Sequence, residues 1–153
     1  MVLGSEMSSG IQHVFVENCT YGGYCKRGIF IKTNPDRGGF IRDIYVNNCE
    51  FGEVEDLFYV TSMYAGEGMD NHHFTEMHDI YVKDLKCKKV NVAALVLQGT
   101  EAKPIYNVTF DNVDVDKAGI GQRGISPFKY VFVAFFTEER KFGEAIGKIF
   151  NIG

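Results

Sequence analysis

Four stretches of this chain repeat one pattern without gaps: IQHVFVENCTY (11–21), IRDIYVNNCEF (41–51), MHDIYVKDLKC (77–87) and IYNVTFDNVDV (105–115). Their fourth and sixth positions are always aliphatic or Phe, which is the two-residue alternation of a β-strand with one buried face. The residue between them is mostly aromatic and points to the opposite face. The repeats start 30, 36 and 28 residues apart, an interval typical of a solenoid in which each repeat is one turn.

Two further columns of this alignment indicate how the turns stack. Asn tolerates a bent backbone, and in stacked strands its amide can hydrogen-bond the copies above and below. The eighth position of the repeats is such a column, reading Asn18, Asn48, Asp84 and Asn112. A column of small apolar side chains follows it, reading Cys19, Cys49, Leu85 and Val113. The cysteines are therefore expected to be free thiols buried in a core rather than a disulfide.

A second β-like run follows the start of each repeat. These runs are GIFIKT (28–33), DLFYVTS (56–62), NVAALVLQG (91–99) and, much weaker, RGISPF (123–128). Two strands per turn, joined by fixed corners, describe an all-β fold, a single-stranded parallel β-helix of about four coils. A β-sandwich also has short alternating strands, but it has no reason to repeat one strand four times with one Asn column. We predict the β-helix over residues 1–118.

Residues 119–153 are expected to form an irregular C-terminal extension or cap. KYVFVAFF (129–136) is an apolar run, and TEERKFGEAIGKIF (137–150) has the pattern of an amphipathic helix that begins at Thr137. An open solenoid end needs a cap, which is one interpretation of this segment. The other is a segment foreign to the repeat, present because the chain is a fragment or its reading frame has shifted.

Bulk composition limits the classes of partner and site. The chain of 153 residues has 16 Lys and Arg against 20 Asp and Glu, a formal charge of −4, so overall charge gives no reason to expect a nucleic-acid or anionic-membrane partner. It has no apolar run of the length that a membrane span needs, and its first residues lack the pattern of a secretory signal. The four cysteines include no CxxC pair, so no metal or cofactor is predicted from them.

The longest interval between repeats contains the extra segment SMYAGEGMDNHHFTE (62–76). Insertions in solenoids map to loops on one face, often the binding face. Asp70, His72 and His73, with neighbouring Glu and His residues, have the side-chain types of a metal site but no fixed metal-binding spacing, so we favour a solvated polar loop. Tyr64 follows the strand directly. It is the loop residue expected to lie near the sheet, either binding a sugar or packing.

The blocks LGSEMSSGI (3–11), VFVENC (14–19) and RGIFIKTNPDRGGFIRDIYVNNC (27–49) together resemble the polygalacturonase-type enzymes of glycoside hydrolase family 28, most closely its bacterial exo-acting members. The resemblance extends over roughly residues 3–118. It implies a right-handed parallel β-helix that hydrolyses the α-1,4 bonds of galacturonan, the acidic polysaccharide of pectin, with inversion. Inverting hydrolysis needs one carboxylic acid to protonate the leaving oxygen and a carboxylate to activate water.

The resemblance also implies which residues are missing. Family members carry their catalytic aspartates in an N-x-D block and a following D-D block, with a His-Gly block just before the Gly-Ser that matches Gly4-Ser5. All three blocks would lie upstream of Met1, and Asp36, Asp43 and Asp56 do not occupy these motifs. No catalytic residue is therefore assigned, and the chain alone is expected to be inactive.

Part of a substrate-binding wall remains. The family's R-I-K motif binds the sugar carboxylate, and it matches Phe30-Ile31-Lys32, so Lys32 carries over by resemblance and the Arg does not. Alternation directs Phe30 and Lys32 outward together, so that Phe30 is expected to offer a sugar-stacking face beside the Lys charge. Arg37, in the PDRGG turn, and Tyr64 are further candidates. Without the resemblance, Lys32 would be interpreted as an ordinary solvated charge.

Three functions stay open at this point. The chain is interpreted as the C-terminal portion of a pectin hydrolase that contributes the sugar-binding wall; the alternatives are a non-catalytic acidic-glycan-binding or structural β-helix module, and a degenerate reading frame. A full-length family member is expected to be secreted or periplasmic. The expected partner is an acidic polysaccharide or oligogalacturonide, and an exposed end of the β-helix predicts self-association.

Overall fold

The computed structural model describes residues 1–65 and 72–117 together with the backbone of 131–134. All regular elements in these residues are β-strands, which confirms the predicted all-β class. They are β1 (Val2–Leu3), β2 (Ile11–Glu17), β3 (Thr20–Lys32), β4 (Phe40–Thr61), β5 (Glu76–Gln98), β6 (Tyr106–Val115) and β7 (Val131–Ala134). In this part of the chain no helix is long and apolar enough to cross a membrane.

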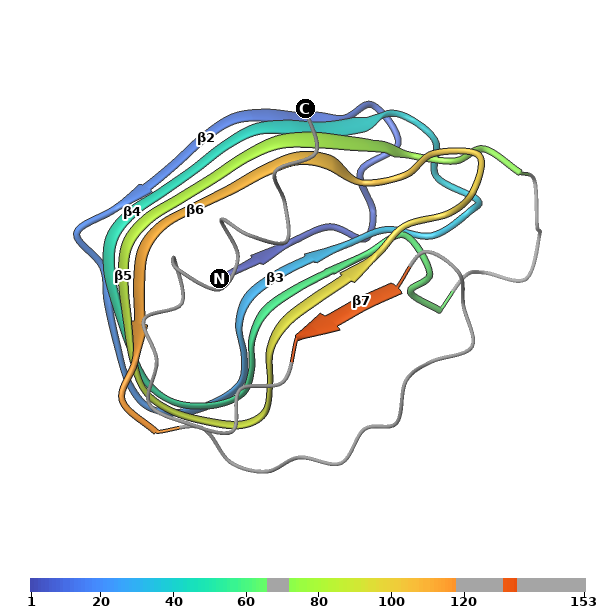
Figure 1. The fold of residues 1–153 in the computed structure, drawn as a ribbon. Helices are drawn as coiled ribbons and strands as arrows, with labels where there is room; N and C mark the ends of the chain where they lie inside the picture. Colours follow the sequence, from blue (N-terminus) through green and yellow to red (C-terminus); the bar gives the residue numbers. More distant parts are fainter. Residues whose placement is uncertain (66–71, 118–130, 135–153) are drawn as a thin grey trace.

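The four sequence repeats stack in parallel, one above the next. Ile11 lies opposite Ile41, which lies opposite Met77. Ile80 lies opposite Val108 in the last pairing. The structure thus reproduces the sequence alignment position by position, and Figure 1 shows β2, β4, β5 and β6 nested along one wall of the coil.

Three of the second runs form the facing wall, and two of them, in β4 and β5, belong to the same strands as their repeats. β4 and β5 have 22 and 23 residues, much longer than ordinary strands, because each continues around a corner from one wall to the other. On this second wall Ile29 of β3 lies opposite Phe58 of β4, which lies opposite Leu95 of β5. The coils therefore consist of stacked strands with shared corners, as a parallel β-helix requires.

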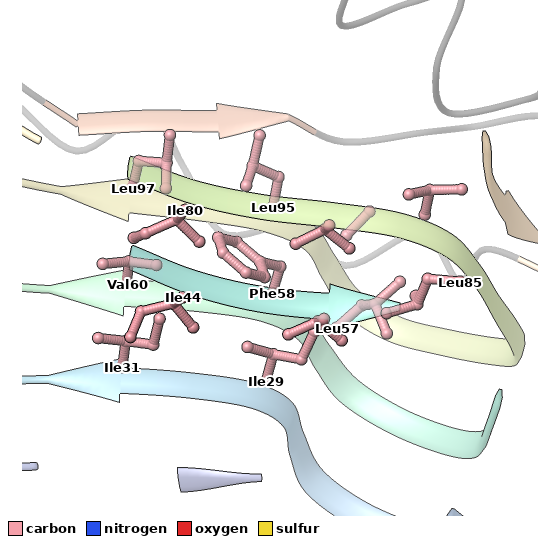
Figure 2. Close-up of a cluster of buried hydrophobic side chains, with 14 of the residues drawn as sticks. Ile29, Ile31, Ile44, Leu57, Phe58, Val60, Ile80, Leu85, Leu95 and Leu97 are labelled. Carbon is pink, nitrogen blue, oxygen red and sulfur yellow. The ribbon is translucent and has the colours of Figure 1, made fainter. Parts of the chain in front are cut away.

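The core fills the space between the two walls. Figure 2 shows Ile44 and Ile80 of the first wall near Ile29, Phe58 and Leu95 of the second. All five side chains are almost completely buried. Phe58 also packs edge to face on Phe110, with ring centroids 4.9 Å apart. The alternation read from the sequence correctly identifies the buried face.

Left-handed residues form the corners of the coil in two columns. The predicted column at the eighth repeat position has φ between 50° and 55°, and Asn48 Nδ2 donates to Asn18 Oδ1 at 2.6 Å. A second column, not predicted, occupies the third repeat position with φ between 52° and 56°, and consists of His13, Asp43, Asp79 and Asn107. Asn, Asp and His are the side chains most often found in this backbone region, which explains both columns.

The cysteines have the state expected from the sequence. All four are free, and Cys49 and Cys87 are buried within the coil. Burial raises the pKa of the Cys87 thiol to about 11, so this side chain stays protonated near neutral pH.

The C-terminal region departs from the repeat. β7 pairs antiparallel with β5, with Leu95 opposite Ala134 and Gln98 opposite Val131. It occupies the edge of β5 on which the weak run RGISPF was expected to continue the second wall, and Figure 1 shows it beside the returning strands. RGISPF itself and the predicted helix over 137–150 lie outside the described residues.

Candidate functional site

A cleft with a volume of about 680 Å³ opens beside the first turn of the second wall. One side is the loop before β2, and the other is the end of β3 with the turn that follows it. We call it the Lys32 cleft; its lining residues are Gly4, Ser5, Glu6, Met7, Ser8, Ser9, Gly10, Ile11, Lys32 and Arg37. Both sides come from the blocks that carried the sequence resemblance.

The loop side is held in place by one side chain and by close backbone packing. Met7 is 5% exposed, and its Sδ lies 3.5 Å from the buried Thr33 hydroxyl. A Cβ at Gly4 would lie 1.9 Å from the carbonyl oxygen of Lys32, and φ of Gly4 is +87°. Only glycine fits there, since any side chain would overlap the backbone of the facing strand. The two sides of the cleft are thereby fixed to each other.

A buried hydroxyl chain supports the turn on the other side. Thr33 Oγ1 lies 2.7 Å from Thr75 Oγ1, and Thr75 Oγ1 donates to the carbonyl oxygen of Gly38 at 2.8 Å. The side chain of the buried Asn34 accepts a hydrogen bond from the amide of Asp36 at 2.9 Å, which closes the turn. These bonds fix the turn that carries Arg37, whose own amide donates to the carbonyl oxygen of Asn34.

The structure brings Lys32 and Tyr64 together. Lys32 Nζ lies 4.2 Å from the centroid of the Tyr64 ring, within cation–π range. The backbone amide of Tyr64 donates to the carbonyl oxygen of Thr33, which holds the loop against the end of β3. Among the described residues no carboxylate is close enough to form an ion pair with Lys32. Its charge is therefore available to an anionic ligand in the cleft.

Phe30 lies beneath these two side chains rather than at the surface. Its ring is 8% exposed and packs edge to face on Tyr59 and Tyr64, at centroid distances of 5.5 Å and 6.0 Å. Arg27 covers another part of it, with its guanidinium 4.6 Å from the ring centroid. The outward direction predicted by alternation is correct, yet the neighbours leave little ring surface for a sugar. The more accessible ring is Tyr64, which is 39% exposed.

Arg27 has a structural partner in the same region. Its Nε lies 3.4 Å from Oδ2 of Asp56, a carboxylate that is 1% exposed. A buried carboxylate is costly without a countercharge, so this ion pair accounts for both side chains. The pairing with Asp56 gives Arg27 a structural role.

The acid content of the cleft limits its chemistry. Glu6 is the one carboxylate among the described residues that line it. Inverting hydrolysis uses two carboxyl groups on opposite faces of the sugar, and these lining residues supply one. The described residues also contain no group of three or more His, Cys, Asp or Glu side chains arranged to hold a metal ion.

A second hollow of about 700 Å³ lies at the opposite corner of the coil. We call it the corner groove; it is lined by Thr20, Tyr21, Gly22, Gly23, Tyr24, Glu50, Gly52, Glu53, Lys88, Lys89, Asp116 and Lys117. Lys88 Nζ lies 3.4 Å from Glu50 Oε1, and Lys89 Nζ lies 3.0 Å from Glu53 Oε1. These two lysines form ion pairs within the protein, whereas Lys32 forms none with the residues that the structure describes.

Of the four side chains expected from the sequence to bind substrate, Lys32 and Arg37 line the cleft, whereas Phe30 and Tyr64 are not among its lining residues. The loop over residues 4–10 was recognised as a family block, yet none of its residues was proposed for the site. The available signal was its composition, because a Gly-bounded run rich in Ser is typical of a loop.

Comparison with known proteins identifies the family of this chain. The model of glycosyl hydrolases family 28 matches residues 2–131. The chain belongs to this family. A probable polygalacturonase from Vitis vinifera is 34% identical to it over 122 residues, which are 77% of this family 28 chain and 24% of the relative. The chain thus spans about a quarter of the length of this relative. No solved structure matches it significantly.

Proposed function

We propose that this chain forms a substrate-binding wall of a pectin-degrading glycoside hydrolase, and that Lys32 and Arg37 bind the carboxylate of a galacturonate unit. The observation that carries the proposal is the charge of Lys32, which has no ion-pair partner among the described residues and lines a cleft between two family blocks. Lys32 reaches the cleft from the end of β3, and Arg37 reaches it from the turn. A carboxylate between two cations gains charge-assisted hydrogen bonds, which are stronger than neutral ones.

The sugar ring is assigned to the exposed face of Tyr64. A pyranose presents C–H groups that pack on an aromatic ring, as other apolar groups do. Phe30 supports this arrangement from below by contacting both Tyr64 and Lys32. The exo-acting type, which the combined sequence blocks most resemble, is part of the same proposal, and it concerns the whole enzyme rather than this wall.

Cleavage is assigned to residues other than those of the described cleft. The chain alone is proposed to bind oligogalacturonate without hydrolysing it, because Glu6 has no second carboxylate beside it in the lining. The same observation favours the second candidate, a non-catalytic module that binds acidic glycans. Reducing-sugar release from polygalacturonate by the purified chain tests this step, and measurable turnover would contradict it.

The binding proposal is tested by titrating trigalacturonate into wild type and Lys32→Met by calorimetry. We expect at least a roughly tenfold loss of affinity, the usual consequence of losing one hydrogen bond to a charged group. Lys89→Met is the control, because it removes the same charge from a lysine that lies outside the cleft and is paired with Glu53 in the corner groove. Equal affinity of wild type and Lys32→Met would refute the assignment of Lys32.

A further inference from the structure

Glu6 occupies a fixed place on the loop side of the Lys32 cleft. The preceding Gly4 is packed on the backbone of Lys32, and the following Met7 is buried under Thr33. Hydrogen bonds from the amide of Met7 to Ser5 O and from the amide of Gly10 to Met7 O close the loop on both sides. The exposed Glu6 side chain therefore starts from a rigid backbone and lines the cleft together with Lys32.

The charge of Glu6 is not used within the described part of the protein. No Lys, Arg or His side chain there forms an ion pair with it. An ionised carboxylate only accepts hydrogen bonds, and its two oxygens can accept from two donors at once. Ser5 and Ser8 lie beside it in the lining and add hydroxyl groups. This side of the cleft thus offers acceptors, whereas the other side offers the cations of Lys32 and Arg37.

Such an arrangement orients an acidic sugar. A galacturonate ring carries its carboxylate on C5 and its O2 and O3 hydroxyls at the opposite edge of the ring. A carboxylate is attracted to Lys32 and repelled by Glu6, so it lies on the Lys32 side. The hydroxyl edge then faces Glu6, and each hydroxyl is a hydrogen-bond donor.

We propose that Glu6 is a specificity-determining residue that accepts hydrogen bonds from the O2 and O3 hydroxyls of the galacturonate unit bound at Lys32. This inference rests on the proposed function and deepens it. It makes the cleft selective for galacturonate whose O2 and O3 are free, because an acetyl group on either oxygen removes the donated hydrogen and leaves an acceptor opposite the carboxylate. Esterification of the sugar carboxylate is sensed by Lys32 and acetylation of the hydroxyls by Glu6.

The experiment measures binding of three probes to the full chain: trigalacturonate, its methyl ester, and trigalacturonate acetylated at O2 and O3. We expect wild type to bind the acetylated probe about tenfold more weakly than the free one, the cost of losing hydrogen bonds to a charged acceptor. Glu6→Ala should bind the free and the acetylated probe with about equal, weak affinity. The affinity of Glu6→Gln for the free probe should lie between those of wild type and Glu6→Ala. Lys32→Met should keep the acetyl discrimination and lose the preference for acid over methyl ester.

Glu17→Ala is the matched control, since it removes the same charge from an exposed position on β2 outside the cleft. Thermal unfolding of each variant establishes that the fold is kept. If Glu6→Ala binds free trigalacturonate as tightly as wild type, or retains the full acetyl discrimination, the inference is wrong while the role of Lys32 stands. If wild type binds none of the probes, the proposed function and this inference both fall.

Discussion

The Lys32 cleft and the corner groove have nearly the same volume, about 680 Å³ and 700 Å³, and both are lined by lysine, glutamate and glycine. They differ in whether their charged side chains form ion pairs within the described part of the protein. In the corner groove Lys88 and Lys89 pair with glutamates on the neighbouring coil. In the cleft Lys32 and Glu6 both line the hollow, and neither forms an ion pair with a described residue. Charges of this kind are suited to a ligand, whereas the ion pairs of the groove stabilise the stacking of coils.

Replacing a tightly packed glycine should have the largest effect on stability. This effect should be similar in the two hollows. A Cβ at Gly4 in the cleft would lie 1.9 Å from Lys32 O, and one at Gly52 in the groove would lie 2.4 Å from Gly23 O. We expect Gly4→Ala and Gly52→Ala each to lower the free energy of unfolding by about 2–3 kcal/mol, because a backbone segment must shift. Urea denaturation monitored by circular dichroism measures this.

The control for these two substitutions lies in the same groove. Gly22 has no heavy atom within 4 Å of the position its Cβ would take, so Gly22→Ala should change stability by less than about 0.5 kcal/mol. A loss at Gly22 equal to that at Gly52 would show that chain flexibility, and not the close approach of the coils, determines the effect.

Substitution in the corner column at the eighth repeat position should have an intermediate effect on stability. Asn48 has φ of 50° and donates to Asn18, and it precedes the groove residues Glu50 and Gly52. Asn48→Ala should cost about 1–2 kcal/mol in the free energy of unfolding, since it loses the hydrogen bond and strains a left-handed residue. Asn48→Gly should cost less, because glycine adopts this backbone freely. If the two variants are equally stable, backbone conformation is not what selects Asn there.

The smallest effect concerns pH and the paired charges of the groove. Hydrogen bonds from Asn91 and Lys89 hold the pKa of Glu53 below its ordinary value of 4.5. A depressed pKa in the folded state stabilises the protein above the ordinary pKa, and this contribution is lost as pH falls through the folded value. Glu53→Gln should therefore be slightly less stable than wild type near pH 7, and the difference should shrink as pH falls below 4.5 and vanish once Glu53 is protonated in the folded state. Melting temperatures measured across this range test it, and a gap that persists at low pH would contradict the linkage.

The sequence was sufficient to predict the register because the coil repeats its own side chains. Val14, Ile44 and Ile80 stack on one another, so the three positions require side chains of similar shape on the same face. In the sequence this requirement appears as a column of similar residues in the aligned repeats. The second corner column was missed because His13, Asp43 and Asn107 share a backbone preference and not a chemical type. An alignment by residue identity does not detect such a column.

The candidate site was less predictable for a different reason. Its residues do not repeat from coil to coil: Lys32 lies opposite Thr61, which lies opposite Gln98. The exposure of Phe30 depends on Arg27, Tyr59 and Tyr64, which come from other parts of the chain. Alternation predicts the direction of such a side chain, but what covers it is decided by tertiary packing.

The long strand β4 has a consequence for how the protein opens. It is paired with β2 and β3 on one edge and with β5 on the other, so its amides are enclosed between two ladders of hydrogen bonds. Stacked coils behave as a one-dimensional array in which each unit is stabilised by its neighbours. Amide hydrogens of β4 should accordingly exchange with solvent deuterium only through the rarest openings, while those of β2 and β6, each described with a single parallel neighbour, exchange first.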